Sequence, residues 1–453
     1  MTRLLVRALL ALTTCAYIAS PALSAQTIVR KVLDNGITVI VKPEAGSGLV
    51  AVDAIVKAGA GQESIQTAGV GNFVSRLLLA STRAKSAEMV ASIADEVGGN
   101  IATSWEPDTS SIRAITTSTG FDKAMNLIGD CLSEANFEPQ WVEQQRKSLL
   151  AGLKVSKDDV FDRAYCDLRQ SLYEDNGYRR PYTVTERAVS LATAQDLQKF
   201  FSMYYAPNNL VLSIAGDVTP DHAFQQVQRA FAGTVARKLP IDRGVPDESI
   251  DRCKFHASEG DAGAAYLLLG WLAPAVGSPD YPAFAVVSTA LGGGKGSMMF
   301  QEIRQKRGIG YEIGTMYPKL KYQSHLVAYV VTDPFKNALP GRTPDLVLDD
   351  AKKAVIALTE ALKSKPLSPE DLERAKGYTI GTYALGHQHL SERAYLLGWA
   401  EAVGLGYAFD SGYADAIQKV TAADVQRVAE KYLANYSAVL VLPKTQSSPT
   451  PKP

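Results

Sequence analysis

The sequence predicts an α+β protein made of two homologous α/β-layered domains. Three observations lead to this prediction. Strand-like and helix-like segments alternate with short turns between them, a pattern typical of layered α+β domains. Two pairs of segments repeat at one offset of about 230 residues, which indicates duplicated halves and not a solenoid of short units. The length of 453 residues and an apolar content of 46% are sufficient for two to three buried cores.

Charge gives no indication of a partner. The chain has 47 Lys and Arg residues and 47 Asp and Glu residues. This balance provides no excess of positive charge for binding nucleic acid or an anionic membrane surface. A nucleic-acid-binding function is therefore not expected.

Residues 1–25 have the layout of a secretory signal peptide. Arg3 and Arg7 precede an apolar run, and small residues follow it before a predicted cleavage after Ala25. We therefore expect an exported protein, periplasmic or extracellular, with no membrane span because the run is short. A mitochondrial presequence is the alternative, since no acidic residue precedes Asp34.

Elements of both kinds follow in the first half. The sequence Asp34-Asn-Gly36 is a turn signal that leads into an alternating strand. Apolar residues recur at helical spacing across residues 70–78, which predicts a helix with one face on a core. Asn72, Ser75 and Arg76 lie together on its other face. The other elements expected here are strands at 32–42 and 49–57, helices at 87–97 and 122–135, and strand-like segments within 100–114.

The internal repeat defines the organisation of the chain. Residues 193–206 match residues 421–434, and each copy begins with Thr followed three residues later by Asp, a variant of the capping box. Residues 139–143 and 369–373 form a second pair, each a helix start led by proline. Two matches at nearly the same offset indicate two related halves.

A segment rich in proline and charge separates these halves. The sequence predicts an N-terminal domain at 28–232, a linker at 233–252 and a C-terminal domain at 253–444. The last residues, 445–453, are rich in Pro, Ser and Thr and are predicted to form a disordered tail.

The helix around residues 68–82 resembles the zinc helix of the insulinase and mitochondrial-processing-peptidase-like family, the inverzincins, whose signature is H-x-x-E-H. In that register Asn72 and Arg76 stand at the positions of the two zinc-binding histidines, and Ser75 stands at the position of the glutamate base. The resemblance places Gly152 at the position of the third ligand. Asn is a poor zinc ligand, Ser is no base near neutral pH, and a charged Arg repels the ion. The resemblance therefore implies a degenerate zinc site, without metal, catalytic residues or metallopeptidase activity of its own.

No other part of the sequence offers a metal site. His387 and His389 are two residues apart and do not share a helix face. Cys131, Cys166 and Cys253 are scattered along the mature chain and make neither a disulfide framework nor a ligand cluster. We expect idle or buried thiols at these positions.

The second half has a glycine-rich loop at Gly292, Gly293 and Gly294. It is not a phosphate loop, because that motif needs Ser or Thr directly after Gly-Lys, and here Gly296 follows Lys295. The stretch resembles the family's glycine-rich loop, which leads into a helix.

Arg304 and Tyr311 follow this loop and resemble the family's pair of substrate-binding residues, which reach across the cleft to a bound peptide. A tyrosine hydroxyl donates to a peptide carbonyl, and an arginine holds backbone carbonyls or a carboxylate. The alternative is a structural role, with Arg304 on a solvated helix and Tyr311 half-buried on a strand.

The resemblance extends from Val29 to Leu442 and implies that the two domains form half of a clam-like shell around a peptide chamber. It favours a non-catalytic subunit that lines the chamber of a heterodimer and provides Arg304 and Tyr311 to a zinc-bearing partner. Zinc is then expected in the partner and not in this chain. One alternative is a scaffold protein, like the core proteins of respiratory cytochrome reductase. Another is a peptidase with an unorthodox site.

Arg76 is expected to fill the vacant metal position and to pair with an acid, since an unpaired buried guanidinium is costly.

Overall fold

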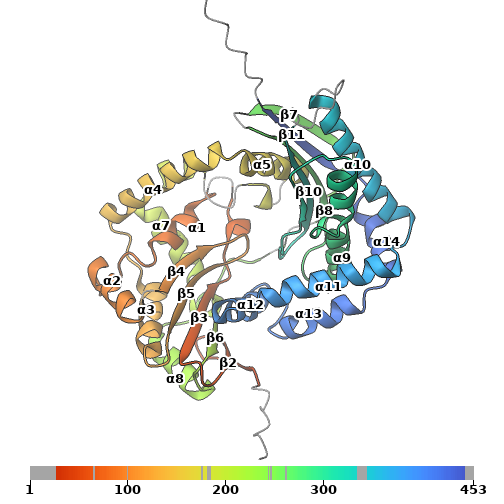
Figure 1. The fold of residues 1–453 in the computed structure, drawn as a ribbon. Coiled ribbons are helices and arrows are strands. Elements are labelled where there is room, and N and C mark those ends of the chain that lie inside the picture. The colour runs from red at the N-terminus through yellow and green to blue at the C-terminus, as the bar shows by residue number, and fades with distance from the viewer. Residues whose placement is uncertain are drawn as a thin grey trace, which may run out of the picture.

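The computed structural model describes residues 27–64, 67–98, 100–174, 177–180, 185–242, 244, 247–260, 263–333 and 344–443. The predicted signal peptide at 1–25 and the predicted tail at 445–453 lie outside the described residues. The described chain forms two β-sheets, each with its own group of helices, and the two halves lie side by side (Figure 1).

The first half contains a six-stranded sheet with the strand order β1-β2-β6-β3-β5-β4. The predicted turn at Asp34-Asn-Gly36 joins β1 to β2, and the Leu33 N–H donates to the Ile37 carbonyl across it. The strands are β1 Val29–Val32, β2 Thr38–Pro43, β3 Leu49–Val56, β4 Asn100–Trp105, β5 Ser110–Thr117 and β6 Leu210–Gly216. The helices are α1 Val70–Leu77, α2 Ala87–Glu96, α3 Phe121–Glu134, α4 Pro139–Asp158, α5 Val160–Leu172, α6 Glu186–Leu191, α7 Ala194–Tyr204 and α8 Pro220–Ala230, with short 3-10 turns η1 Ala60–Gln62, η2 Gly177–Arg179 and η3 Pro207–Asn209.

The second half contains a five-stranded sheet with the order β7-β11-β8-β10-β9. Its strands are β7 Lys254–Gly260, β8 Ala265–Ala273, β9 Glu312–Met316, β10 Ser324–Thr332 and β11 Ser437–Pro443. Its helices are α9 Tyr281–Gly292, α10 Pro344–Ser364, α11 Pro369–Leu385, α12 Leu390–Ala402, α13 Phe409–Gln418 and α14 Ala422–Tyr432, with a π-helix, η4, at Phe300–Lys306.

The five strands of the second sheet have the same order and pairing as five strands of the first sheet, which has β1 as an additional edge strand. In each, one parallel pair (β2 with β6, β7 with β11) is followed by antiparallel pairs in the same chain order. Both predicted capping boxes are present, because the Thr193 and Thr421 hydroxyls accept from the backbone N–H of Asp196 and Asp424. The internal duplication read from the sequence is therefore confirmed by strand order and by helix starts.

Each half also covers the sheet of the other half with one helix. Helix α5, from the first half, packs on β8 and β11 of the second sheet, and α12, from the second half, packs on β3 and β6 of the first sheet (Figure 1). A glycine allows the close approach in both places: a Cβ on Gly270 would lie 2.9 Å from Leu168 Cδ2, and a Cβ on Gly398 would lie 2.7 Å from Ile55 Cδ1. The Tyr395 hydroxyl on α12 also donates to Glu106 Oε2 of the first half at 2.7 Å.

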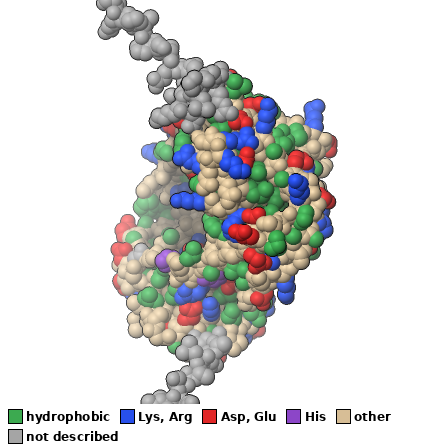
Figure 2. Space-filling model, turned by 45° about the vertical axis from the view of Figure 1, so that its right-hand side comes forward, with side chains coloured by type: hydrophobic (Ala, Val, Ile, Leu, Met, Phe, Trp, Pro, Cys, Tyr) green, Lys and Arg blue, Asp and Glu red, His purple; other side chains and the backbone are tan. Residues whose placement is uncertain are grey.

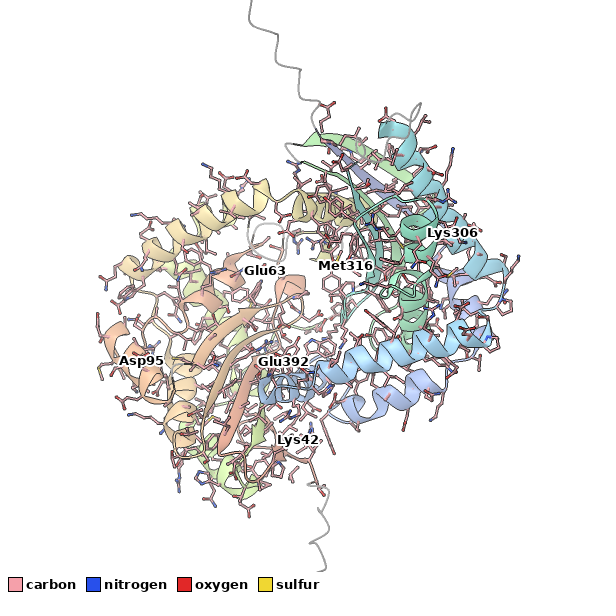
Figure 3. All side chains as sticks on the ribbon, in the orientation of Figure 1. Lys42, Glu63, Asp95, Lys306, Met316 and Glu392 are labelled. Atoms are coloured by element: carbon pink, nitrogen blue, oxygen red, sulfur yellow. The ribbon has the colours of Figure 1, made fainter. Side chains whose placement is uncertain are left out.

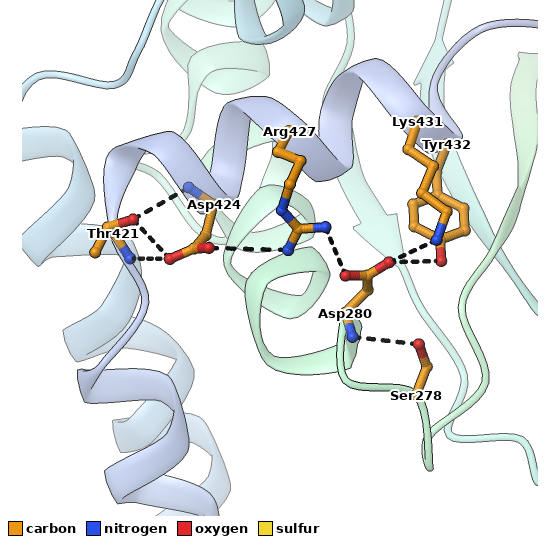
Figure 4. A network of polar contacts seen from close by, with 7 residues as sticks. All are labelled: Ser278, Asp280, Thr421, Asp424, Arg427, Lys431 and Tyr432. Atoms are coloured by element: carbon orange, nitrogen blue, oxygen red, sulfur yellow. Dashed lines mark hydrogen bonds and ion pairs between the residues drawn. The ribbon is translucent and has the colours of Figure 1, made fainter.

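A polar network fixes the start of α9 to α14 in the second half (Figure 4). Asp280 Oδ1 accepts from Arg427 at 2.7 Å, and Oδ2 accepts from Lys431 at 2.8 Å and from the Tyr432 hydroxyl at 2.9 Å. Burial alone would raise the pKa of Asp280, but hydrogen bonds from Lys431, Arg427 and Tyr432 lower this pKa to about 2. The carboxylate therefore stays ionised and holds the two helices together.

Other expectations concern the core and the surface. Trp271, on β8, is only 1% exposed and belongs to the core of the second half. Positive and negative side chains are interspersed on the face drawn in Figure 2, in agreement with the balanced composition. Within the described residues, no helix combines the length and apolar character needed to cross a bilayer.

Candidate functional site

Helix α1 begins with a carboxylate placed against its free N–H groups. Glu63 Oε2 accepts from the Gly69 N–H at 2.8 Å, and Oε1 accepts from the Gly71 N–H at 2.7 Å. The first N–H groups of a helix have no partner within the helix, so Glu63 satisfies two of the donors at this end. Burial raises the pKa of Glu63 to about 7, although both N–H groups and Arg180 act in the opposite direction. Figure 3 shows Glu63 just ahead of α1.

Three positions of the degenerate zinc site lie on this helix and contact one another or the neighbouring strand. Asn72 Oδ1 accepts from Arg76 Nε at 3.0 Å. Ser75 Oγ donates to the Ser104 carbonyl of β4 at 3.0 Å, so the residue at the base position ties helix to strand. Asn72 is 5% exposed and Ser75 is 1% exposed. The helix is therefore buried on both faces around these two residues.

The predicted pairing of Arg76 with an acid is wrong. Arg76 is exposed, and the ion pairs of the described residues include none that it makes. Its guanidinium bonds to Asn72, one helical turn earlier, while the rest of its charge faces solvent. Water solvates the guanidinium there, which avoids the cost of burying it and removes the need for a carboxylate partner.

The fourth position, Gly152, lies on α4 and provides no side chain. A Cβ built there would have no atom within 4 Å, so packing does not require glycine. Across the described ranges, no cluster of three or more His, Cys, Asp or Glu side chains could hold a metal ion. An amide, a hydroxyl that donates to a carbonyl, a guanidinium and a glycine do not fit zinc, which needs neutral imidazoles, thiolates or carboxylates.

An aromatic side chain occupies the space beside the start of α1. A Cβ on Gly71 would lie 2.0 Å from Trp105 Cη2, so the indole ring is in direct contact with the helix backbone. The Trp105 ring also meets Phe200 edge to face, with centroids 6.1 Å apart. Sequence reasoning singled out neither Glu63 nor Trp105. An acid shortly before a predicted helix was the sequence signal that could have identified Glu63 as a partner of the helix N-terminus. Trp105 gave no such signal, because it reaches α1 only through the tertiary fold.

The glycine-rich loop of the second half is explained by close packing. A Cβ on Gly292 would lie 2.6 Å from the Thr315 backbone nitrogen in β9. A Cβ on Gly293 would lie 2.7 Å from the Thr289 carbonyl oxygen. Gly294 has φ 72°, in the left-handed region, and its Cβ would lie 2.7 Å from the Tyr378 ring. Larger residues would clash at all three positions.

Arg304 and Tyr311 are brought to one turn. Arg304 lies on η4, and its Nη1 donates to the Gly310 carbonyl at 2.7 Å, which fixes the residue before Tyr311. The Tyr311 side chain is 58% exposed at the start of β9, the edge strand. Among the contacts of the described residues, none joins either side chain to the degenerate zinc site. Their role as a peptide-binding pair stays a prediction.

Two histidines, His387 and His325, have structural partners. His387 Nε2 lies 2.7 Å from Asp410 Oδ1, and Nδ1 lies 2.8 Å from the Tyr383 carbonyl, at the end of α11. His325 is buried between the hydroxyls of Tyr165 and Tyr173, and burial lowers its pKa to about 3.

Comparison with known proteins identifies the family. Residues 38–185 match the family described as Insulinase (Peptidase family M16), and residues 192–378 match the Peptidase M16 inactive domain. The chain belongs to the insulinase (M16) family. The inactive-domain match begins directly after α6, so it includes α7, β6 and α8 of the first half as well as most of the second.

The relatives of this M16 chain span its whole fold. An uncharacterized zinc protease of Streptomyces coelicolor is 25% identical over 424 residues, covering 92% of this chain and 89% of that protein. An uncharacterized zinc protease of Mycobacterium tuberculosis is 26% identical over 421 residues, covering 91% and 92%.

Two solved structures share the architecture. A protease from Helicobacter pylori has a TM-score of 0.83 at 20% identity and covers 92% of this chain and 100% of its own. A peptidase M16 inactive domain from Pseudomonas fluorescens has a TM-score of 0.81 at 18% identity and covers 93% and 100%. The predicted α+β fold of two M16-like halves is confirmed.

Proposed function

We propose that this chain is the non-catalytic subunit of a heterodimeric insulinase-family peptidase. It lines half of a peptide chamber, and a homologous subunit with an intact zinc helix lines the other half and cuts the peptide. The observation that carries the proposal is selective loss. All four zinc-site positions lack a metal ligand or base, while the helix, its Glu63 contacts and the duplicated fold around it are complete.

The contribution of this chain is peptide binding through Arg304 and Tyr311. The hydrogen bond from Arg304 to Gly310 presents the exposed Tyr311 ring at the sheet edge. A tyrosine hydroxyl at this place can donate to a peptide carbonyl held at the partner's metal. We further propose that the heterodimer works outside the cytoplasm, on the evidence of the leader-like residues 1–25.

The test combines the purified chain with a zinc-bearing homologue from the same source and measures hydrolysis of a quenched fluorescent peptide. We expect the mixture to cleave the peptide faster than either protein alone. Tyr311→Phe keeps the ring and removes the hydroxyl, so it should lower kcat/KM of the mixture by roughly tenfold. Arg304→Ala should act in the same direction. Lys306→Ala, on the same π-helix and exposed, is the matched control and should leave the rate unchanged.

Two results would contradict the proposal. Chelator-sensitive hydrolysis by the isolated chain, together with stoichiometric zinc in metal analysis, would show that the chain has its own site. A stable complex with the homologue that never cleaves peptide, whatever the ratio, would favour a scaffold function instead.

A further inference from the structure

The second half contains a cavity of about 400 Å³ that lies outside the degenerate zinc site. It lies between α9, α11 and the start of α12, and its walls include Lys319, Tyr378, Thr382, Tyr383, Glu392 and Tyr395. Figure 3 labels Glu392 at the start of α12, between the two halves of the molecule. A volume of this size suits a small ligand of a few residues.

The cavity lies at the place in the second half that corresponds, through the internal duplication, to the zinc-site position in the first half. Helix α9 packs against α11, α13, α14 and β9 in the way that α1 packs against α4, α6, α7 and β4. Counted from the proline that begins each helix, Thr382 in α11 holds the place that Gly152 holds in α4. The cavity is therefore the second-half counterpart of the family's reaction site.

One wall of the cavity carries a positive charge without a counterion. Lys319 is partly buried, and its Nζ lies 4.7 Å from the centroid of the Tyr383 ring. Among the described residues, no carboxylate lies within ion-pair distance of this ammonium group. Asp410, the acid that acts on it from further away, is occupied by the Tyr383 hydroxyl and by His387. Burial lowers the pKa of Lys319, and a ligand carboxylate would compensate the lost solvation.

A second wall carries a negative charge. Glu392 lies in the first turn of α12, lines the cavity, and makes no ion pair among the described residues. Tyrosine rings form much of the remaining lining. The Tyr317, Tyr383 and Tyr395 hydroxyls already donate to Pro274, Asp410 and Glu106, so these residues offer ring surface to a ligand. Tyr378 and Thr382 add hydroxyl groups to the lining.

We propose that this cavity binds a short peptide with free termini, with the peptide carboxylate at Lys319 and the peptide ammonium at Glu392. The tyrosine rings form the surface for an aromatic or apolar side chain of the peptide. The inference rests on the proposed function only in the choice of a peptide as the ligand. The cation, the anion and the cavity themselves are independent of any partner subunit.

Isothermal titration calorimetry of the full chain with the dipeptide Ala-Phe tests the inference. Ala-Phe amide, without the carboxylate, and acetyl-Ala-Phe, without the ammonium, should each bind at least tenfold more weakly. Lys319→Met should bind Ala-Phe and its amide with equal, weakened affinity. Glu392→Gln should do the same for Ala-Phe and acetyl-Ala-Phe. Lys306→Met and Glu370→Gln, both exposed, are the matched controls and should bind like the unmodified chain.

We do not expect Lys319→Met to cause a folding defect. Lys319→Met removes a buried charge and keeps the side-chain length, so its thermal midpoint should not fall. The inference is overturned if Ala-Phe does not bind, or if amidation and acetylation leave its affinity unchanged. Binding of inorganic phosphate at Lys319 without binding of Ala-Phe would also overturn it and would indicate a general anion site.

A chain that stimulates the zinc-bearing homologue but fails these titrations would contradict this inference alone. A chain that binds Ala-Phe but never affects the homologue would contradict only the proposed function.

Discussion

Glycine occurs twice at the degenerate zinc site for opposite reasons. At Gly71 the Trp105 ring leaves no room, because a Cβ would lie 2.0 Å from Cη2. At Gly152 a Cβ would meet no atom within 4 Å, so packing does not require glycine there. The same residue type is therefore required at one position and replaceable at the other.

Replacing Gly152 by alanine should stabilise the protein. Glycine in a helix interior is less favourable than alanine by up to about 1 kcal/mol, and the site has space for a methyl group. We expect Gly152→Ala to raise the free energy of unfolding in urea by about 0.5–1 kcal/mol. Gly71→Ala is the contrasting variant and should lower it by more than 1 kcal/mol, because Trp105 must move. A loss of stability in Gly152→Ala would mean that packing requires the glycine.

At this scale the zinc-site positions assigned by resemblance stay a prediction, and the sequence did not predict the contacts of these residues. Asn72, Ser75, Arg76 and Gly152 follow from position alone. Their partners do not, because Ser104 and Trp105 reach α1 only through the tertiary fold. The sequence predicts a carboxylate partner for Arg76, because local spacing does not reveal that its guanidinium remains in solvent.

The contact between α9 and α14 depends on one carboxylate with three donors. Asp280→Asn should lower the free energy of unfolding by about 1–3 kcal/mol at pH 7, since it weakens charge-assisted hydrogen bonds from Arg427, Lys431 and Tyr432. Urea unfolding of the variant and the parent protein measures the difference. Asp251→Asn, at an exposed aspartate, is the control and should have little effect.

This difference should depend on pH in a defined direction. The pKa of Asp280 is about 2 in the folded state and 3.8 in its ordinary range, so the folded state favours the ionised form. Its contribution to stability is complete above pH 3.8 and is lost as the pH falls toward 2. The parent and Asp280→Asn should therefore converge in stability between about pH 4 and pH 2. A constant difference across this range would show that the ionised carboxylate is not the source of the effect.

Most elements follow from local patterns, and the exceptions have a physical reason. The strands at β2 and β3, the helices α2 and α3, and the capping boxes at Thr193 and Thr421 lie at or close to the expected positions. The π-helix η4 was not expected. A widened helical turn of this kind is stabilised by its surroundings, and residue propensities give no signal for it.

The exchange of α5 and α12 makes the two halves dependent on each other. Gly398 on α12 lies against β3 and β6, where a Cβ would meet Ile55 at 2.7 Å and Ser213 at 2.8 Å. We expect Gly398→Ala to lower the free energy of unfolding by about 1–3 kcal/mol. Gly381→Ala, in α11 with no atom within 4 Å of its Cβ, is the matched control and should have a neutral or stabilising effect. Equal effects of the two substitutions would argue against close packing at α12.

The isolated halves should not fold. A fragment of residues 28–242 would expose the apolar face of α5, including Leu168 and Leu172, and would leave its own sheet without α12. We expect each half alone to lack cooperative thermal unfolding in circular dichroism, and the two co-expressed halves to regain it. A cooperative transition in either half alone would contradict this expectation.

The sequence predicted the duplication but not this exchange. Periodicity shows which face of a helix is apolar. It does not show which sheet that face covers, because that partner is set by the tertiary fold. The predicted domain boundaries therefore describe two consecutive halves, whereas the packing exchanges one helix between them.

The reciprocal helices also bear on how a gene of this kind can change over time. Deleting the first half would leave the second sheet without α5 and would leave α12 without a surface to pack on. Selection for a foldable product is then sufficient to preserve both halves, whatever chemistry either of them carries.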